Sequence, residues 1–122
     1  MSNKTCEQKV KKSFEGRMED IRTLYKAEDF ETEDLGSLYD YGLCIDKVEA
    51  GTFNDQRENY YRYQLSWGGP SEEFRLYENG EMEYWFLDWN DGAKVDVEGE
   101  DLDIIKEIIS WNFDEVLKFG QE

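Results

Sequence analysis

Alternating apolar and polar residues over about 60–97 constrain the fold more than any other feature of this sequence. Three turn signals interrupt the alternation, namely Gly68-Gly69-Pro70-Ser71, Asn79-Gly80 and Asn90-Asp91-Gly92. An Asn-Gly pair between two β-rich runs is the strongest short-range signal for a hairpin. We therefore predict a four-stranded antiparallel meander, in a sheet that spans about 43–97. Residues 43–49 are a candidate fifth strand at its edge.

The lengths of the three turns predict which residues pair across the strands. A two-residue turn at Asn79-Gly80 places Phe74 opposite Trp85, and the four-residue loop places Leu65 opposite Phe74. The three-residue loop places Leu87 opposite Val95. All three registers put the same set of side chains on one face of the sheet. This predicted core face contains Tyr61, Tyr63, Leu65, Trp67, Phe74, Leu76, Trp85, Leu87, Trp89, Val95 and Val97.

The opposite face of the sheet is predicted to be charged at its edges and aromatic in its centre. If it is uncovered, Tyr77, Met82, Tyr84 and Phe86 form an exposed apolar patch rimmed by charge, and such patches usually mark interaction sites. The equally weighted alternative is a three-layer domain, in which the N-terminal helix covers this face. The face contains Arg62, Gln64, Glu73, Arg75, Tyr77, Met82, Tyr84, Phe86, Asp88, Lys94 and Asp96.

Apolar residues at three- and four-residue spacing predict one helix before the sheet and one after it. The helix over about 5–27 is predicted from Val10, Phe14, Met18, Ile21 and Tyr25. The helix over about 100–118 is predicted from Leu102, Ile105, Ile109, Phe113 and Val116. The expected fold is a single α+β domain over 1–122, in which the meander packs with an N-terminal and a C-terminal helix.

The charge and the missing residue types exclude several functions. The chain has 30 acidic and 14 basic residues, a net charge of −16, which repels nucleic-acid phosphates and anionic membranes. It has no histidine, the commonest general base and metal ligand. Cys6 and Cys44 are too few for a four-thiolate zinc site, and we expect them to be reduced thiols of a cytoplasmic protein. We predict no enzymatic activity, no cofactor and no metal ion.

One string near the last turn has some features of a calcium-binding loop. Asp88, Asp91 and Asp96 could surround a cation there. The glycine comes one place too early, however, and the twelfth position is Gly99 where a calcium loop has glutamate. An ordinary hairpin turn is therefore the favoured interpretation.

The segment 60–74, together with 83–89 and Asp91-Gly92-Ala93, resembles a family of small acidic proteins carried by phages, plasmids and other mobile elements. The resemblance covers about residues 41–110 and implies no activity that can be assigned residue by residue. It does imply a context, because small acidic proteins of mobile elements are often inhibitors of host defence. Anti-CRISPR and antirestriction proteins are examples, and several of these mimic DNA.

The charge is distributed unevenly along the chain. Residues 1–26 have seven basic and four acidic side chains, a net charge of +3, whereas residues 27–122 have a net charge of −19. A compact chain of this length is about 35 Å across. A DNA duplex of that length presents about 20 phosphates. We therefore expect a non-enzymatic inhibitor of the anti-CRISPR or antirestriction type. It would act as a DNA mimic on a basic nucleic-acid-binding surface of a host CRISPR effector or restriction enzyme.

In this hypothesis, exposed carboxylates attract the partner and aromatic side chains give short-range specificity. The predicted aromatic contacts are Tyr77, Tyr84 and Phe86. The predicted carboxylates are Glu28, Asp29, Glu31, Glu33, Asp34, Glu72, Glu73, Glu78, Glu81 and Asp88. The alternative is a general protein-interaction module that uses the aromatic sheet face, with the acidity serving only solubility.

Overall fold

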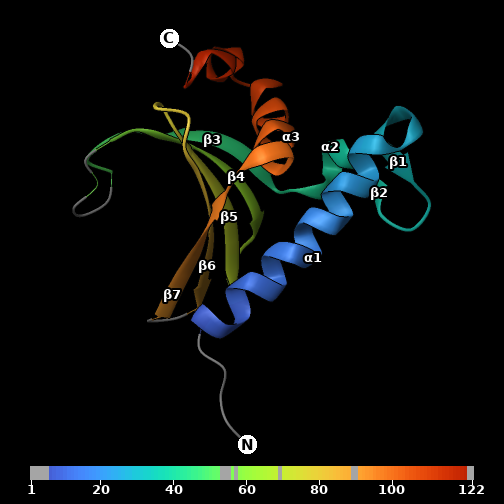
Figure 1. The fold of residues 1–122 in the computed structure, drawn as a ribbon, viewed down its shortest axis with the longest axis horizontal. Helices are drawn as coiled ribbons and strands as arrows, with labels where there is room; N and C mark the ends of the chain where they lie inside the picture. Colours follow the sequence, from blue (N-terminus) through green and yellow to red (C-terminus); the bar gives the residue numbers. More distant parts are fainter. Residues whose placement is uncertain (1–5, 53–55, 57, 69, 89–90, 121–122) are drawn as a thin grey trace, which may run out of the picture.

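A five-stranded antiparallel sheet with two helices on one face forms most of the protein (Figure 1). The computed structural model describes residues 6–52, 56, 58–68, 70–88 and 91–120. Each strand pairs with its neighbour in sequence, so the sheet is a meander. Its strands are β3 (Cys44–Val48), β4 (Tyr60–Ser66), β5 (Ser71–Tyr77), β6 (Met82–Asp88) and β7 (Asp91–Val97). The α+β prediction is confirmed, and the candidate edge strand is β3.

Helix α1 (Cys6–Lys26) forms as the apolar spacing predicted. Its residues Met18, Ile21 and Leu24 are completely buried, and the helix packs against β6 and β7. Residue 5, where the predicted helix began, lies outside the described residues. No helix in the described part of the chain has both the length and the apolar character needed to cross a bilayer.

Four short elements follow α1. The first two lie within 28–34, where the sequence predicted an exposed loop. The four are the 3-10 helix η1 (Glu28–Phe30), the strands β1 (Glu31–Thr32) and β2 (Gly36–Ser37), and helix α2 (Leu38–Tyr41). Strands β1 and β2 form a two-stranded hairpin, and the Ser37 side chain accepts a hydrogen bond from the Tyr39 amide at the start of α2. This region lies at the C-terminal end of α1, away from the large sheet (Figure 1).

The C-terminal helix is shorter than predicted. Helix α3 (Gly99–Ser110) ends at Trp111, and a separate 3-10 helix, η2 (Asp114–Lys118), follows. The break lets Phe113 and Phe119 pack on Tyr61, with ring centroids 5.1 and 5.4 Å away.

The predicted strand registers are wrong, and the β5–β6 hairpin shows why. The Tyr77 amide donates to the Glu81 carbonyl, and the Gly80 amide donates to the Tyr77 carbonyl. The loop therefore has three residues instead of two, with Gly80 in the left-handed conformation at φ 92°. Phe74 consequently pairs with Tyr84 instead of Trp85. A slip of one residue exchanges the two faces of β6.

The other two registers also differ from the prediction. An irregularity between Gln64 and Ser66 makes Tyr63 the partner of Phe74, a slip of two residues that preserves the face. Across β6 and β7, Val95 pairs with Tyr84 instead of Leu87.

These slips decide which predicted core residues are buried. Trp67 is 60% exposed, and Trp85 and Leu87 lie half-buried on the face without helices. Val95 is half-buried on the helix-covered side, and Trp89 lies outside the described residues. The prediction was correct for Tyr61, Tyr63, Leu65, Phe74, Leu76 and Val97.

Candidate protein-interaction site

Two of the predicted partner-binding carboxylates, Glu72 and Glu73, are buried. Their residues are 8% and 3% exposed, so the prediction that they offer charge to a partner is wrong. Glu73 accepts a hydrogen bond from Arg75 at 2.6 Å. The Arg75 guanidinium lies over the rings of Trp85 and Tyr60, 4.2 and 4.9 Å from their centroids. Glu73 is thus neutralised within the uncovered sheet face.

Glu72 joins α1 to the sheet. Arg17 donates from Nε to Oε1 at 3.1 Å and from Nη2 to Oε2 at 2.8 Å. Tyr84 donates to Oε1 at 2.5 Å, and Ser66 donates to Oε2 at 3.0 Å. Burial by itself would raise the pKa of Glu72, but hydrogen bonds from Arg17, Tyr84 and Ser66 hold it below its usual value. This carboxylate has a structural role.

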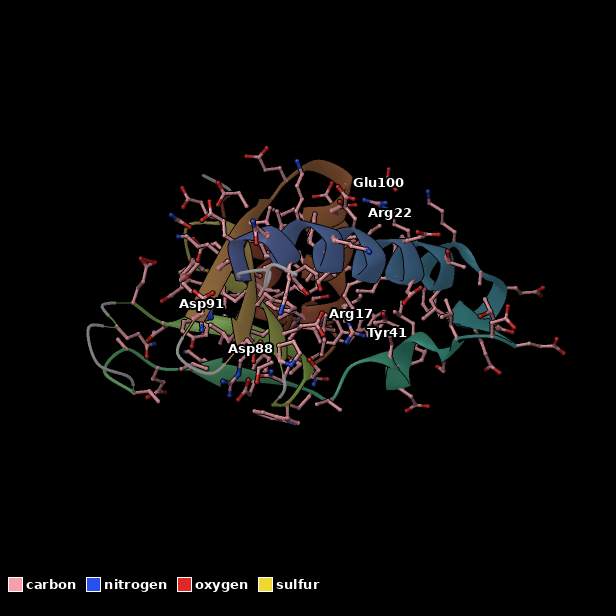
Figure 2. The ribbon with its side chains drawn as sticks, turned by 90° about the horizontal axis from the view of Figure 1, so that it is seen from below. Arg17, Arg22, Tyr41, Asp88, Asp91 and Glu100 are labelled. Carbon is pink, nitrogen blue, oxygen red and sulfur yellow. The ribbon has the colours of Figure 1, made fainter. Side chains whose placement is uncertain are left out.

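The same network continues from Arg17 toward α2. Arg17 donates from Nη1 to the Tyr41 hydroxyl at 3.2 Å, and Tyr41 donates to Asp20 at 2.8 Å. Figure 2 shows Arg17 and Tyr41 side by side between α1 and the chain of α2. The network therefore fixes the position of α2 relative to α1.

The predicted exposed aromatic patch is not found. Tyr84 and Phe86 are 0% and 5% exposed, and Met82 is 2% exposed, because all three face the helices. The ring centroids of Phe14, in α1, and Tyr84 lie 5.4 Å apart. The alternative that the N-terminal helix covers these residues is therefore correct. The interaction module that depended on this patch has no exposed surface there.

Tyr77 lies half-buried on the other face of the sheet. Its hydroxyl donates to Glu83 at 2.7 Å, and Lys94 donates to the same carboxylate. Tyr77 is thus separated from Tyr84 and Phe86 by the thickness of the sheet. The three predicted aromatic contacts do not form one surface.

The remaining sheet carboxylates lie at separate places. Glu78 and Glu81 are exposed near the β5–β6 turn, where Asn59 donates to Glu78 at 3.2 Å. Asp88 lies 4.0 Å from Lys9, near the start of α1. Residues 28–34 follow the other end of this 21-residue helix, which is about 30 Å long. These groups do not form a single continuous acidic surface with 28–34.

The predicted acidic loop remains the strongest candidate site. Residues 27–43, which we call the acidic segment, contain six carboxylates and no lysine or arginine. Among the residues that the structure describes, no cation or hydrogen-bond donor pairs with any of these six side chains. All of them are exposed: Glu28, Asp29, Glu31, Glu33, Asp34 and Asp40.

Aromatic side chains lie directly beside these carboxylates, and the sequence analysis did not identify them. The Phe30 ring stacks on the Tyr25 ring, with 5.8 Å between their centroids. The Trp111 ring centroid lies 5.8 Å from that of Phe30 and 4.8 Å from that of Tyr39. Asp29 and Phe30 both have φ of 56°, a left-handed conformation that is uncommon for phenylalanine. This backbone turn directs Phe30 into the cluster. Phe30 is the single apolar residue of the acidic stretch 28–34, and its isolated position there was the available signal.

The described residues contain no group of three or more histidine, cysteine, aspartate or glutamate side chains that could hold a metal ion. The Cys44 side chain is exposed, but partial burial and the Asp46 carboxylate raise the pKa of its thiol. A raised pKa lowers the thiolate fraction and hence the nucleophilicity.

Comparisons with protein-family models, with curated proteins and with solved structures each gave no match.

Proposed function

We propose that this protein is a non-enzymatic inhibitor that binds a basic nucleic-acid-binding surface with its acidic segment. The observation that carries the proposal is the set of six exposed, unpaired carboxylates in residues 27–43. The proposed partner is a host restriction enzyme or CRISPR effector, and this choice of partner rests on the resemblance to mobile-element proteins. The protein itself binds no nucleic acid in this proposal, because its net charge of −16 repels phosphates.

The acidic segment is favoured over other acidic parts of the described surface because its carboxylates are not already paired with a cation. A partner that used Asp101 would have to displace Arg22, which donates to it at 2.8 and 2.6 Å. Arg22, Glu100 and the start of α3 lie together in Figure 2. The six carboxylates of the acidic segment need no such displacement. Their charge is available both for long-range attraction and for direct contact.

The number of carboxylates in the acidic segment determines the length of DNA that it could mimic. Six carboxylates correspond to about 10 Å of duplex axis, since DNA carries one charge per about 1.7 Å. The acidic segment would therefore replace the phosphates of a few base pairs, instead of the 35 Å considered for the whole chain. We expect fast, salt-sensitive association, because clustered charge mainly increases the encounter rate.

The test compares two variants of equal net charge. The first neutralises four of the six carboxylates of the acidic segment, with Glu28→Gln, Glu31→Gln, Glu33→Gln and Asp34→Asn. The matched control neutralises four exposed carboxylates elsewhere, with Glu7→Gln, Glu15→Gln, Glu98→Gln and Asp103→Asn. DNA cleavage by purified restriction endonucleases and CRISPR nucleases is measured with each variant. We expect the first variant to lose inhibition by about ten-fold or more, and the control by about three-fold or less.

Salt and competing DNA provide the second half of the test. Inhibition should weaken between 50 and 300 mM NaCl by about ten-fold or more, and duplex DNA should displace the protein from its partner. Equal inhibition by both variants, or inhibition that does not change with salt, would contradict the proposal.

A further inference from the structure

A pocket of about 240 Å³ opens between α2 and α3, beside the acidic segment. Its walls include Tyr39 and Leu43 at or just after α2, Tyr63 of β4, and Trp111 at the end of α3. A cavity of about 150 Å³ lined by apolar side chains is large enough to hold a benzene ring. The pocket therefore has room for one ring-sized apolar group.

The opening of this pocket exposes apolar side chains. Tyr39 is 65% exposed and Leu43 is 52% exposed. In the described part of the chain, the other large exposed hydrophobic residues are Trp67 and Leu117, neither of which lines the pocket. Tyr39 and Leu43 border the same pocket, whereas exposed apolar residues that stand alone are common on any protein.

The Tyr63 ring forms part of the pocket wall. The residue is only 3% exposed, and its hydroxyl oxygen is buried close to the Gly42 backbone. A Cβ atom at Gly42 would lie 2.2 Å from Tyr63 Cε1 and 2.9 Å from the hydroxyl oxygen. Only glycine therefore fits against this ring. The Tyr63 ring therefore forms a fixed part of the pocket wall, and a ligand would contact the ring instead of the buried hydroxyl.

The surroundings of the pocket define the charge of its ligand. Tyr39 and Leu43 belong to the acidic segment, which has six unpaired carboxylates and no cation. A second copy of this chain would bring the same acidic segment and a further charge of −16 to the pocket. Like charges brought together in this way repel. A basic partner segment has the opposite, complementary charge.

We propose that this pocket receives one apolar side chain from a lysine- and arginine-rich segment of the partner. A tryptophan supplies a large apolar ring of this kind. This inference rests on the proposed function and adds a specific anchoring contact to its charge attraction. The carboxylates would attract the segment, and the pocket would fix its position.

The probes are three synthetic heptapeptides, titrated into the ¹⁵N-labelled full chain and followed by NMR. One has six lysines around a central tryptophan, the second has alanine at the centre, and the third has tryptophan between glycines and serines. We expect the lysine–tryptophan peptide to shift the signals of Tyr39, Gly42, Leu43 and Trp111. It should bind about five-fold or more tightly than the alanine peptide.

Two substitutions test the pocket itself. Leu43→Ala removes an exposed apolar wall of the pocket and should weaken the lysine–tryptophan peptide by about two- to ten-fold, without changing the alanine peptide. Tyr39→Ala should weaken it by at least as much. Leu117→Ala is the control, because it removes an exposed apolar residue that does not line the pocket, and it should change neither affinity.

The outcomes separate this inference from the proposed function. Equal affinity for the lysine–tryptophan and alanine peptides would overturn the proposed contact in the pocket and leave the charge attraction intact. If the uncharged tryptophan peptide bound as tightly as the charged one, the basic segment and the proposed function would be overturned. Shifts of the same signals with protein concentration alone would overturn the choice of partner, since a second copy would then be the occupant.

Discussion

The guanidinium of Arg17 forms two hydrogen bonds with the carboxylate of Glu72, which joins α1 to β5 across 55 positions of sequence. The Glu72 side chain is only 10% exposed, whereas that of Arg17 is 27% exposed. Tyr84 and Ser66 occupy further acceptor positions of the carboxylate. Loss of the cation would therefore leave a buried charge held only by neutral donors.

Arg17→Ala should lower the free energy of unfolding by about 2 kcal/mol, since it leaves the Glu72 charge buried without its cation. Urea denaturation monitored by circular dichroism measures the change. Arg22→Ala is the comparison, because its partner Asp101 and Arg22 itself are 18% and 42% exposed at the side chain. We expect a loss below about 1 kcal/mol there. Equal losses in the two variants would show that the buried position of Glu72 is unimportant.

The Glu72 carboxylate should also make stability depend on pH in the acid range. Although burial opposes it, hydrogen bonding from Arg17, Tyr84 and Ser66 lowers the pKa of Glu72 in the folded state. The unfolded chain has the ordinary value of about 4.3. The ionised form therefore stabilises the fold above that pH, and this contribution is lost as the pH falls through the lower, folded-state pKa.

Urea midpoints of the wild type and Glu72→Gln, measured from pH 7 to pH 2.5, test this effect. The wild type should be more stable at pH 7, and the difference should shrink below about pH 4.5. Taking the difference cancels the titration of the many other carboxylates. A difference that stayed constant down to pH 2.5 would contradict the assigned direction.

Buried tyrosines should make the fold sensitive to alkaline pH. Burial, together with a hydrogen bond to Glu115, raises the pKa of Tyr61 to about 12. Burial likewise raises the pKa of Tyr41 to about 12, with a smaller contribution from its bond to Asp20 and an opposing one from Arg17. Unfolded tyrosine titrates near 10. The stabilisation from these raised pKa values is present below about pH 10 and is lost as the pH rises toward 12.

Phenolate absorbance during an alkaline titration measures this directly. We expect the folded protein to ionise later than the same protein in 8 M urea, and Tyr61→Phe to remove part of the late signal. A folded protein whose tyrosines all titrated near pH 10 would contradict the burial seen here.

Two glycine substitutions should have opposite effects. Gly42→Ala places a Cβ 2.2 Å from Tyr63 Cε1, so we expect a loss of about 2 kcal/mol from overpacking. Gly16→Ala lies inside α1, where nothing is within 4 Å of the new Cβ, so we expect a gain of about 1 kcal/mol. Thermal and urea unfolding of both variants test the pair. Destabilisation by Gly16→Ala would contradict the open space that the structure shows around position 16.

Local patterns predicted the types of element better than their mutual arrangement. The spacing of Met18 and Ile21 identified α1, because one turn of a helix brings such residues to the same side whatever lies beyond. The position of Tyr84 was predicted incorrectly, because one extra residue in the turn before it reverses the face of the strand. Burial of Glu72 was not predictable from its neighbours, since its cation lies 55 positions away.

The candidate site was also only partly predictable. The density of Asp and Glu over 28–34 identified an exposed acidic region directly from the sequence, and all its carboxylates are exposed. Trp111 and Tyr63, however, reach the same region from α3 and β4. Nothing in the local pattern around either residue indicates that they share a pocket with Tyr39.

The sequence by itself determined an acidic α+β chain, with one helix before an antiparallel meander and one after it. Helical and strand periodicity and total charge are properties of neighbouring residues and of composition, so they can be read without coordinates. Only the tertiary structure decided which face of β6 is buried and which carboxylates remain free. Those outcomes depend on the length of a turn and on partners distant in sequence, such as Arg17 for Glu72.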